Sequence, residues 1–291
     1  MVSKPVQEAL NKQVQMEAES SQAYLAMASW AEIQPGLEGV TEFFYKQSDE
    51  ERVHELKLIR FINERGGFAA VPALPQPMIT FQSLRRVFEE FLKHENSWPS
   101  WAFSNHDVVR AASRWQPGGD GFDHDQRLSK LLIALLGCLY GTVFMYQGEE
   151  LGLPEAKLKR EDLRDPWGIH LYPKWQGRDG CRTPIPWDAD SFTQPSWLPY
   201  AETHKPLDIE TQESIEDSTL NFTRRFLNKR KLLPALRDGE IKFMDTGDDK
   251  LLAFTRSNEN DNILCVFNLS TDHKEFVGKA FEPYGVYMGR L

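Results

Sequence analysis

The 291-residue sequence has few cysteines: Cys138, Cys181 and Cys265 lie far apart, and no CxxC pair occurs. This scarcity argues against a disulfide scaffold and a cysteine-based zinc site, and it is typical of proteins in a reducing compartment. The sequence also lacks an apolar run long enough to span a membrane, since LLIALLGCLYGTVFMY is too short and contains two glycines. The polar N-terminus, MVSKPVQEALNKQ, does not resemble a signal peptide. We therefore expect a cytoplasmic protein that has no membrane partner.

The sequence also lacks an excess of positive charge. Its 34 Lys and Arg residues are outnumbered by 43 Asp and Glu residues, which gives a formal net charge of −9. The first 96 residues and the rest are both acidic, so a nucleic-acid partner is not expected. What the sequence does contain is 41% hydrophobic and 12% aromatic residues, enough for sizeable cores in one large or two medium domains.

Residues 1–96 have the apolar periodicity of helices. Apolar or small residues recur at helical spacing in 6–32 and in 37–65, so we predict a long helix over each range. A Pro-Gly pair separates these two helices, and a Gly-Gly pair ends the second. After a Pro-rich connection we predict a third helix that ends near Glu95, where a Trp-Pro pair stops it.

Carboxylates interrupt the apolar faces of all three predicted helices. Glu17, Glu51 and Glu95 share the phase of the apolar stripes, and His54 lies one turn after Glu51. Burying unpaired carboxylates costs several kcal/mol, and a divalent cation between them would remove that cost. A Glu-x-x-His pair projects both side chains from one helix face, as in di-iron carboxylate bundles. The sequence therefore predicts a metal site with Tyr24 as a hydrogen-bond partner beside it, the alternative being a solvated Glu-His pair without a metal.

Three stretches closely resemble bacterial non-haem ferritins: EAESSQAYLAMASWAE, SDEERVHELKLIRFINERGG and LRRVFEEFLKHE. The resemblance covers about residues 6–95 and implies a helical-bundle subunit of an iron-storage cage, although the fourth helix of such a bundle has no counterpart here. It assigns Glu17 and His54 to a first iron; Glu51 would bridge the two ions, and Glu95 would hold the second. We therefore expect one or two iron ions as cofactor, with Mn or Zn as alternatives, and Fe(II) and O₂ as partners.

Beyond residue 97 the sequence alternates short strands and helices. Strands are predicted at 101–103 and 142–146, with an apolar helix at 123–140 between them. Polar residues follow each strand directly, which is the layout of a (β/α) barrel, where the chemistry lies on loops at the C-terminal ends of the strands. A long loop rich in Trp, Pro and Gly comes next, and then a helix at 214–231. These segments predict two βα units of a barrel.

From about residue 239 onward, short alternating segments separated by turn residues predict an antiparallel β domain. The predicted strands lie at 240–245, 250–256, 262–269 and 274–277. The expected fold class is therefore a composite of α, α/β and β parts. Its domains are a partial ferritin-like bundle over 1–96, a partial (β/α) barrel over 97–238 and a small antiparallel β domain over 239–291.

A second set of motifs strongly resembles bacterial α-glucosidases of the α-amylase superfamily: WAFSNHDVVR, GTVFMYQGEELGLPE, DPWGI, GRDGCRTPIPWD and FTRRFLNKRKLLPALRDG. The resemblance covers about residues 98–291 and implies that the two βα units are the last two of an eight-stranded barrel. It implies that His106 and Asp107 bind the glycosyl hydroxyls, and that Asp107 stabilises the transition state. Arg110 and Arg178 would bind substrate from the neighbouring loops.

The predicted glycosidase machinery is incomplete. A retaining glycosidase needs a carboxylate nucleophile and a carboxylic acid/base about 5–5.5 Å apart. The resemblance places both on the fourth and fifth barrel strands, which have no counterpart here, so Asp107 alone would not support hydrolysis. Glu149 and Glu150 are poor substitutes. Two interpretations stay open for this part: an α-glucosidase acting on short α-glucosides, or a sugar-binding remnant that uses His106, Asp107 and Tyr146 without turnover.

We predict iron binding through the partial ferritin-type site as the function of the chain, with ferroxidase-type oxidation at most, because more of that site's ligands are present. The two parts look like pieces of unrelated families, and two strands cannot close a barrel. Three outcomes stay open for the incomplete sheet. The helices cover it, or copies of the chain associate through its edge, or the sequence is a recombined or computed fusion that was never selected to fold.

Overall fold

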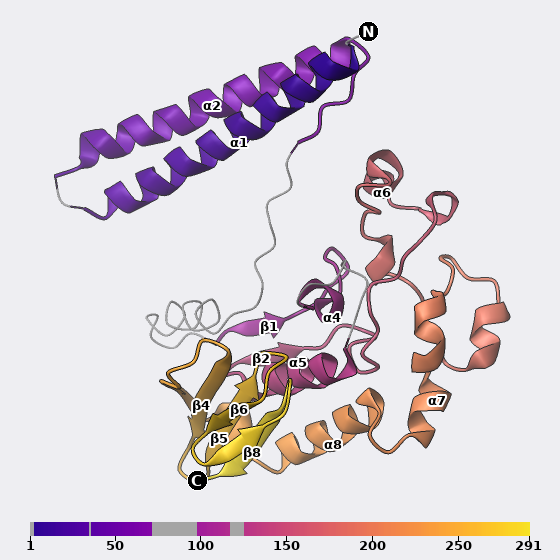
Figure 1. Cartoon of the computed structure of the whole chain (residues 1–291). Coiled ribbons are helices and arrows are strands. Elements are labelled where there is room, and N and C mark those ends of the chain that lie inside the picture. Colours follow the sequence, from indigo (N-terminus) through magenta and orange to yellow (C-terminus); the bar gives the residue numbers. More distant parts are fainter. Residues whose placement is uncertain (1–2, 35, 72–97, 117–124) are drawn as a thin grey trace. The chain divides into compact units, whose positions relative to one another are not determined.

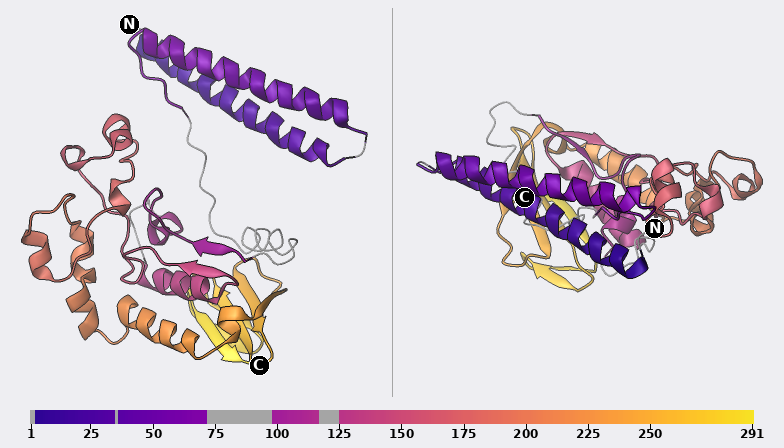
Figure 2. Two further views of the ribbon diagram at one scale, coloured as in Figure 1. Left: turned by 180° about the vertical axis from the view of Figure 1, so that it is seen from behind. Right: turned by 90° about the horizontal axis from the view of Figure 1, so that it is seen from above.

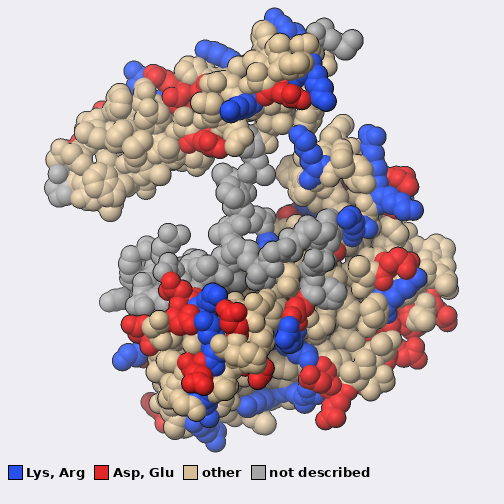
Figure 3. Space-filling model, in the orientation of Figure 1, with Lys and Arg blue, Asp and Glu red and all other residues tan. Residues whose placement is uncertain are grey.

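The computed structural model describes residues 3–34, 36–71, 98–116 and 125–291 (Figure 1). It divides into two compact units, Met1–Pro77 and Met78–Leu291. Within the described ranges, no helix is both long enough and apolar enough to cross a membrane. On the face drawn in Figure 3, basic and acidic side chains are interspersed over the second unit.

The first unit is a hairpin of two long helices, α1 (Lys4–Glu32) and α2 (Glu38–Glu64), which lie side by side (Figures 1 and 2). Most buried positions recur every seven residues, which keeps one narrow stripe of each helix against its partner. These positions are Val14, Ser21 and Ala28 on α1, and Thr41, Ser48, Glu55 and Ile62 on α2. At the centre, the hydroxyl of Ser21 donates to Ser48 O and the hydroxyl of Ser48 donates to Ser21 O, both at 2.9 Å.

The narrow stripe leaves large apolar side chains of the hairpin exposed. Trp30 is 59% exposed and Phe43 is 53% exposed, and Figure 3 shows mostly uncharged surface where α1 turns into α2. The two predicted long helices are confirmed. The third predicted helix and Glu95 lie outside the described residues, so the described part of this unit is a two-helix hairpin.

The second unit begins with a β–α–β arrangement. Its elements are β1 (Ser100–Ala102), the short helix α4 (Ala111–Arg114), α5 (Gln126–Cys138) and β2 (Thr142–Phe144). The two strands are parallel neighbours, with Trp101 opposite Val143. Asp125 caps α5 by accepting the N–H of Arg127, and the helix is buried on nearly every side because it is apolar all round. The predicted order of strand, helix and strand is therefore confirmed.

A long loop with short helices follows β2. Its helices, and those after it, are η1 (Arg160–Asp162), α6 (Pro166–Leu171), η2 (Asp179–Cys181), η3 (Ala189–Thr193), η4 (Glu202–Leu207), α7 (Ile209–Ser214), α8 (Thr219–Lys231) and α9 (Ala235–Asp238). Buried polar groups hold the loop: Asp179 Oδ2 accepts the N–H groups of Arg164 and Asp165 at 2.6 and 2.7 Å. Two segments cross at Gly168, where a Cβ would lie 2.2 Å from the backbone oxygen of Gln176. Only glycine fits such an approach.

The C-terminal strands form an antiparallel sheet and a separate two-stranded hairpin. The sheet has the order β3 (Glu240–Met244), β4 (Leu251–Ser257), β5 (Asn262–Asn268) and β8 (Val286–Arg290), and the hairpin pairs β6 (Lys274–Phe276) with β7 (Lys279–Phe281). One face of the sheet, with Phe254 and Phe267, lies in the same buried cluster as Leu131 and Leu135 of α5 and Phe226 of α8. The predicted barrel part and β domain therefore share one core.

Most predicted elements of the second unit are confirmed, with ends that differ by a few residues. The single helix predicted at 214–231 is wrong at its start, because Ser218 begins a new helix, α8, by accepting the N–H of Asn221. The predicted strands 240–245, 250–256 and 262–269 correspond to β3, β4 and β5. The sequence does not predict β7 and β8.

Arg256 joins the sheet to the end of α5. It is completely buried on β4, and its guanidinium donates to Cys138 O at 2.6 Å and Leu139 O at 2.8 Å, at the C-terminus of α5. Nε and Nη2 both donate to Gly239 O, at 3.0 and 2.8 Å. Burial lowers the pKa of Arg256 to about 10. The charge is tolerated because its donors are satisfied by backbone oxygens.

We expect Arg256→Met to destabilise the second unit by at least about 3 kcal/mol, because several buried carbonyls would each lose a donor at about 1–3 kcal/mol apiece. The free energy of unfolding would be measured by urea titration. The matched control is Arg224→Ala, which removes an exposed ion pair with Glu213 and should cost less than about 1 kcal/mol. Equal losses for the two variants would contradict a structural role for Arg256.

Candidate functional site

Asp107 lies on the loop that follows β1, at the C-terminal end of this strand. The loop turns tightly, because Asn105 Oδ1 accepts the N–H of Asp107 at 2.8 Å. The side chain of Asp107 is 51% exposed, and its Oδ2 lies 3.3 Å from His106 Nε2. The two residues that the α-glucosidase motif predicts to bind sugar are thus adjacent and accessible.

Two arginines from the GRDGCR segment converge on Asp107. Arg178 Nη1 donates to Asp107 Oδ1 at 3.1 Å, and Arg182 Nη2 donates to the same oxygen at 3.0 Å. Arg182 Nε also donates to His106 O at 2.7 Å. These bonds fix both the carboxylate and the backbone of its loop, while the other oxygen of Asp107 stays turned toward His106. Arg178 was predicted for this site, and Arg182 was not.

Asp165 orients Arg178. Its buried carboxylate accepts Nε at 2.8 Å and Nη2 at 3.1 Å from Arg178, a two-point pair that fixes the plane of the guanidinium. The hydrogen bond from Arg178 lowers the pKa of Asp165 to about 2, and Asp165 in turn raises the pKa of Arg178. The guanidinium carbon of Arg178 also lies 4.9 Å from the centre of the Trp167 ring. Arg178 is therefore held in place before any ligand binds.

Arg110 does not face the site. It is 1% exposed; Nη1 donates to Gln147 O at 2.7 Å and Nη2 donates to Cys181 O at 3.1 Å. Its backbone N–H donates to Glu155 Oε2 at 2.9 Å. The prediction that Arg110 binds substrate needs correction, because these donors are turned toward the backbone of two other loops. Arg110 is a positioning residue for the loop that carries Asp107.

The carboxylates after β2 close turns. Glu149 Oε2 accepts the N–H of Tyr146 and Glu150 Oε2 accepts the N–H of Gly148, both at 2.8 Å. Burial raises the pKa of both side chains. The hydroxyl of Tyr146 donates to Cys181 O at 3.1 Å, so it supports the GRDGCR segment. Glu149 and Glu150 thus have local structural partners.

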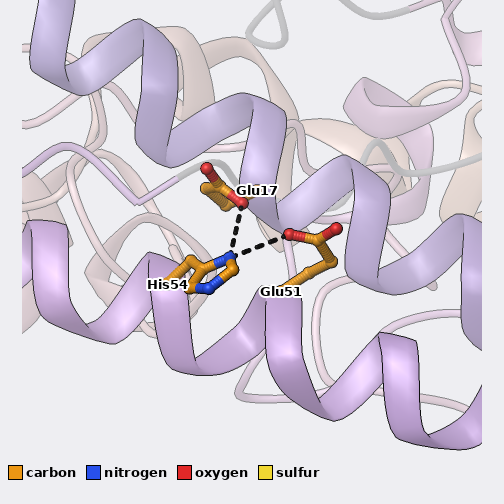
Figure 4. A group of neighbouring side chains, drawn as sticks. All are labelled: Glu17, Glu51 and His54. Carbon is orange, nitrogen blue, oxygen red and sulfur yellow. Dashed lines mark hydrogen bonds and ion pairs between the residues drawn. The ribbon is translucent and has the colours of Figure 1, made fainter.

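A second cluster lies on the helical hairpin, where Glu17 of α1 meets Glu51 and His54 of α2 (Figure 4). His54 Nδ1 lies 3.6 Å from Glu17 Oε2 and 3.2 Å from Glu51 Oε2, and one ligand atom from each residue falls within 4.8 Å of the others. Gln13 donates to Glu17 at 2.7 Å, and this bond holds the pKa of Glu17 below its usual value although burial opposes it. The predicted convergence of these three side chains is therefore present.

Of the other two predicted members of the metal site, Glu95 lies outside the described ranges, so the structure does not place it. Tyr24 packs against Phe44, with ring centroids 6.2 Å apart. The side chains of Glu17, Glu51 and His54 are 15%, 22% and 53% exposed. Water reaches the cluster, so a bound cation is not needed to offset buried charge.

The comparisons with known proteins show the family of the chain. A model of the α-amylase catalytic domain matches residues 4–239, and a model of the maltogenic amylase C-terminal domain matches residues 241–286. The chain belongs to the α-amylase family. Its second unit is a fragment of the α-amylase-type (β/α) barrel followed by the C-terminal β-sheet domain.

Among its relatives are α-glucosidases. A probable α-glucosidase of Rhizobium meliloti (strain 1021) is 46% identical in an alignment 212 residues long, which covers 70% of this chain and 38% of that protein. A probable oligo-1,6-glucosidase 2 of Bacillus subtilis (strain 168) is 27% identical over 69% of this chain and 39% of that protein. The structure of the α-glucosyl transfer enzyme XgtA is similar with a TM-score of 0.65 and 30% identity, over 88% of this chain and 54% of that one. The chain thus spans less than half the length of the first two relatives.

These findings correct the function predicted from the first 96 residues. Iron binding is wrong as the function of the chain, because the matching family and the relatives are α-amylase-type glycosidases. The predicted composite is confirmed in its α-glucosidase part, whereas the ferritin-like bundle and the fusion of two families receive no support. The expectations of iron, Mn or Zn as cofactor, of O₂ as partner and of self-association are tested by none of these findings and stay predictions.

Glu155 should make the stability of the folded state depend on pH. It is 3% exposed, and burial raises its pKa to about 7 from an ordinary value of 4.5. A carboxyl whose pKa is raised on folding stabilises the folded state fully below pH 4.5, and that contribution is lost as the pH rises through about 7. Asp165, whose pKa is lowered, affects stability in a separate pH range: its contribution is present above about pH 3.8 and is lost as the pH falls to about 2.

In the unmodified chain, the free energy of unfolding should fall between about pH 4.5 and 7 as Glu155 ionises. We expect Glu155→Gln to make this fall smaller by up to about 3 kcal/mol, since one pKa unit corresponds to about 1.4 kcal/mol. Urea unfolding at several pH values would measure this. Glu149 and Glu150 contribute in the same direction and remain in the variant. Glu259→Gln, at an exposed turn, is the control and should leave the slope unchanged. An unaltered slope in Glu155→Gln would refute the raised pKa.

Proposed function

We propose that the chain provides the sugar-binding part of an α-glucosidase-type active site, in which Asp107 binds hydroxyl groups of an α-linked glucosyl residue. The observation that carries this proposal is the orientation of Asp107 by Arg178 and Arg182 at the C-terminal end of β1. The family of the chain and the relatives named α-glucosidase support it.

Asp107 has hydrogen-bond acceptor positions left for a sugar. A carboxylate can accept about four hydrogen bonds, and Arg178 and Arg182 both donate to Oδ1 of Asp107. Oδ2 faces His106, whose side chain is 69% exposed. Two neighbouring hydroxyls of a glucose ring can therefore bind between Asp107 and His106. The negative charge of Asp107 would also stabilise positive charge that develops on the ring during cleavage.

Hydrolysis needs more than this. The retaining mechanism uses two further carboxyl groups about 5–5.5 Å apart. In the described part of the chain, the side chains within ion-pair distance of Asp107 are those of His106, Arg178 and Arg182, and none of them is a carboxylic acid. Glu149 and Glu150 are engaged by backbone N–H groups. We therefore propose that this chain binds α-glucosides without turning them over, and that cleavage is the second candidate.

Binding would be tested by isothermal titration with methyl α-D-glucoside. We expect Asp107→Asn to weaken the affinity at least tenfold, because the variant loses the negative charge that pairs with the two arginines and accepts the hydroxyls. Asp272→Asn is the matched control: Asp272 is 57% exposed and pairs with Lys250 at 2.9 Å, far along the chain from Asp107. Similar affinities for the two variants would show that Asp107 is not the binding group.

Turnover would be tested with p-nitrophenyl α-D-glucoside. We expect the unmodified chain to release nitrophenol no faster than the Asp107→Ala variant, because a nucleophile and an acid/base are not paired with Asp107 in the described residues. Release that depends on Asp107 would instead establish the hydrolytic candidate and would direct the search to carboxylates elsewhere in the chain.

A further inference from the structure

Three sulfur atoms from separate segments meet in the core of the second unit. Cys138 is the last residue of α5, Cys265 lies on β5, and Met288 lies on β8. Cys265 and Met288 are directly opposite each other in the antiparallel pairing of their strands. The thiol of Cys138 donates to Met288 Sδ at 3.7 Å, and a side-chain hydrogen bond links Cys138 to Cys265. Because the two cysteines lie far apart in the sequence, their spacing does not indicate that they meet.

The spacing of these sulfurs suits one soft metal ion. With metal–sulfur bonds of about 2.3 Å, three ligands in a trigonal plane lie about 4 Å apart. The separation of Cys138 Sγ from Met288 Sδ is 3.7 Å, so these ligands need little movement to close around an ion. Soft thiolate and thioether ligands select ions such as Cu(I). Three ligands are fewer than the four that a structural zinc ion takes, which favours Cu(I) over zinc.

A buried positive charge lies beside the sulfurs. Cu(I) bound by two thiolates has a single negative charge, and both cysteines are completely buried, so this charge needs a partner. The guanidinium of Arg256 donates to Cys138 O at 2.6 Å and interacts electrostatically with both cysteines. The complex and Arg256 would together be electrically neutral, which offsets the cost of burying either charge alone.

A cavity of about 210 Å³ gives an ion access to Met288. It lies between α5, α8 and β8, and its wall is formed by Ala134, Phe222, Arg225, Phe226, Lys229, Val286 and Met288. Arg225 and Lys229 are exposed residues, so the cavity is open to solvent. Met288 is therefore the ligand that an entering ion meets first. Its flexible, polarizable side chain can pass the ion inward to the two cysteines.

We propose that Cys138, Cys265 and Met288 form a binding site for one Cu(I) ion. Binding forms three copper–sulfur bonds and breaks two S–H bonds, whose protons pass to the solvent, while the oxidation state of copper stays the same. The bound ion would join the C-terminal end of α5 to β5 and β8. The site shares no residue with the proposed sugar site, so either proposal can fail without the other.

The test mixes the full chain with the coloured Cu(I)–bicinchoninate complex under anaerobic conditions with ascorbate. The loss of colour measures the copper that the chain withdraws, and we expect one equivalent per chain. Met288→Leu keeps the volume of the side chain but removes the thioether, and it should weaken the affinity at least tenfold. Cys138→Ala and Cys265→Ala should each abolish the withdrawal. X-ray absorption by the bound copper should show sulfur ligands alone.

Cys181→Ala is the matched control, because Cys181 is an equally buried cysteine whose thiol donates to Arg178 O at 3.1 Å. His54→Ala is a second control, since it removes the imidazole of the cluster on the helical hairpin. Both variants should keep the affinity of the unmodified chain. If the variants of Cys138 and Cys265 prove unfolded in urea titration, the comparison of Met288→Leu with Cys181→Ala decides. The inference is overturned if the unmodified chain withdraws no copper, if Met288→Leu and Cys181→Ala have equal affinities, or if nitrogen or oxygen ligates the copper.

Discussion

Arg110 is almost completely buried between three loops of the second unit. Its guanidinium donates to Gln147 O after β2 and to Cys181 O in the GRDGCR segment, and its N–H donates to Glu155. A buried charge is costly unless it is hydrogen-bonded, so separating the loops would break the Nη1 and Nη2 bonds that pair it, and Nε already has no partner in the described residues. Because Asp107 precedes Arg110 by three residues, the same contacts determine where Asp107 lies relative to the arginines that hold it.

Asp107 itself is half exposed, and its environment is assembled from distant parts of the chain. Arg178 and Arg182 reach it from the long loop, and Asp165 holds Arg178 from behind. The rigid base beneath these loops is the β1–β2 pair with α5, which shares its core with the C-terminal sheet. Binding residues on ordered loops above a packed scaffold are typical of barrel enzymes.

In the helical hairpin, whether side chains converge and whether they bind a metal ion are two different matters. Helical spacing correctly predicts that Glu17, Glu51 and His54 meet, because residues three, four and seven apart share one face of a helix. An ion would be required only if these groups were buried without partners. His54 is 53% exposed to solvent and Gln13 donates to Glu17, so these groups are not buried without partners. Convergence of donors is therefore not sufficient for a metal-binding function, and the family of the chain directs attention to the sugar site instead.

By itself the sequence determined the long helices, α5 and the strands β3–β5, because the periodicity of apolar residues is a local property. Its motifs also identified Asp107 and Arg178. Only the tertiary structure decided that Arg182 joins Asp107 and that Arg110 is a buried support. The arginines that hold Asp107 lie 71 and 75 residues away from it. The burial of a side chain and its distance from such a partner depend on how the whole chain packs, and no local spacing of residues records either one.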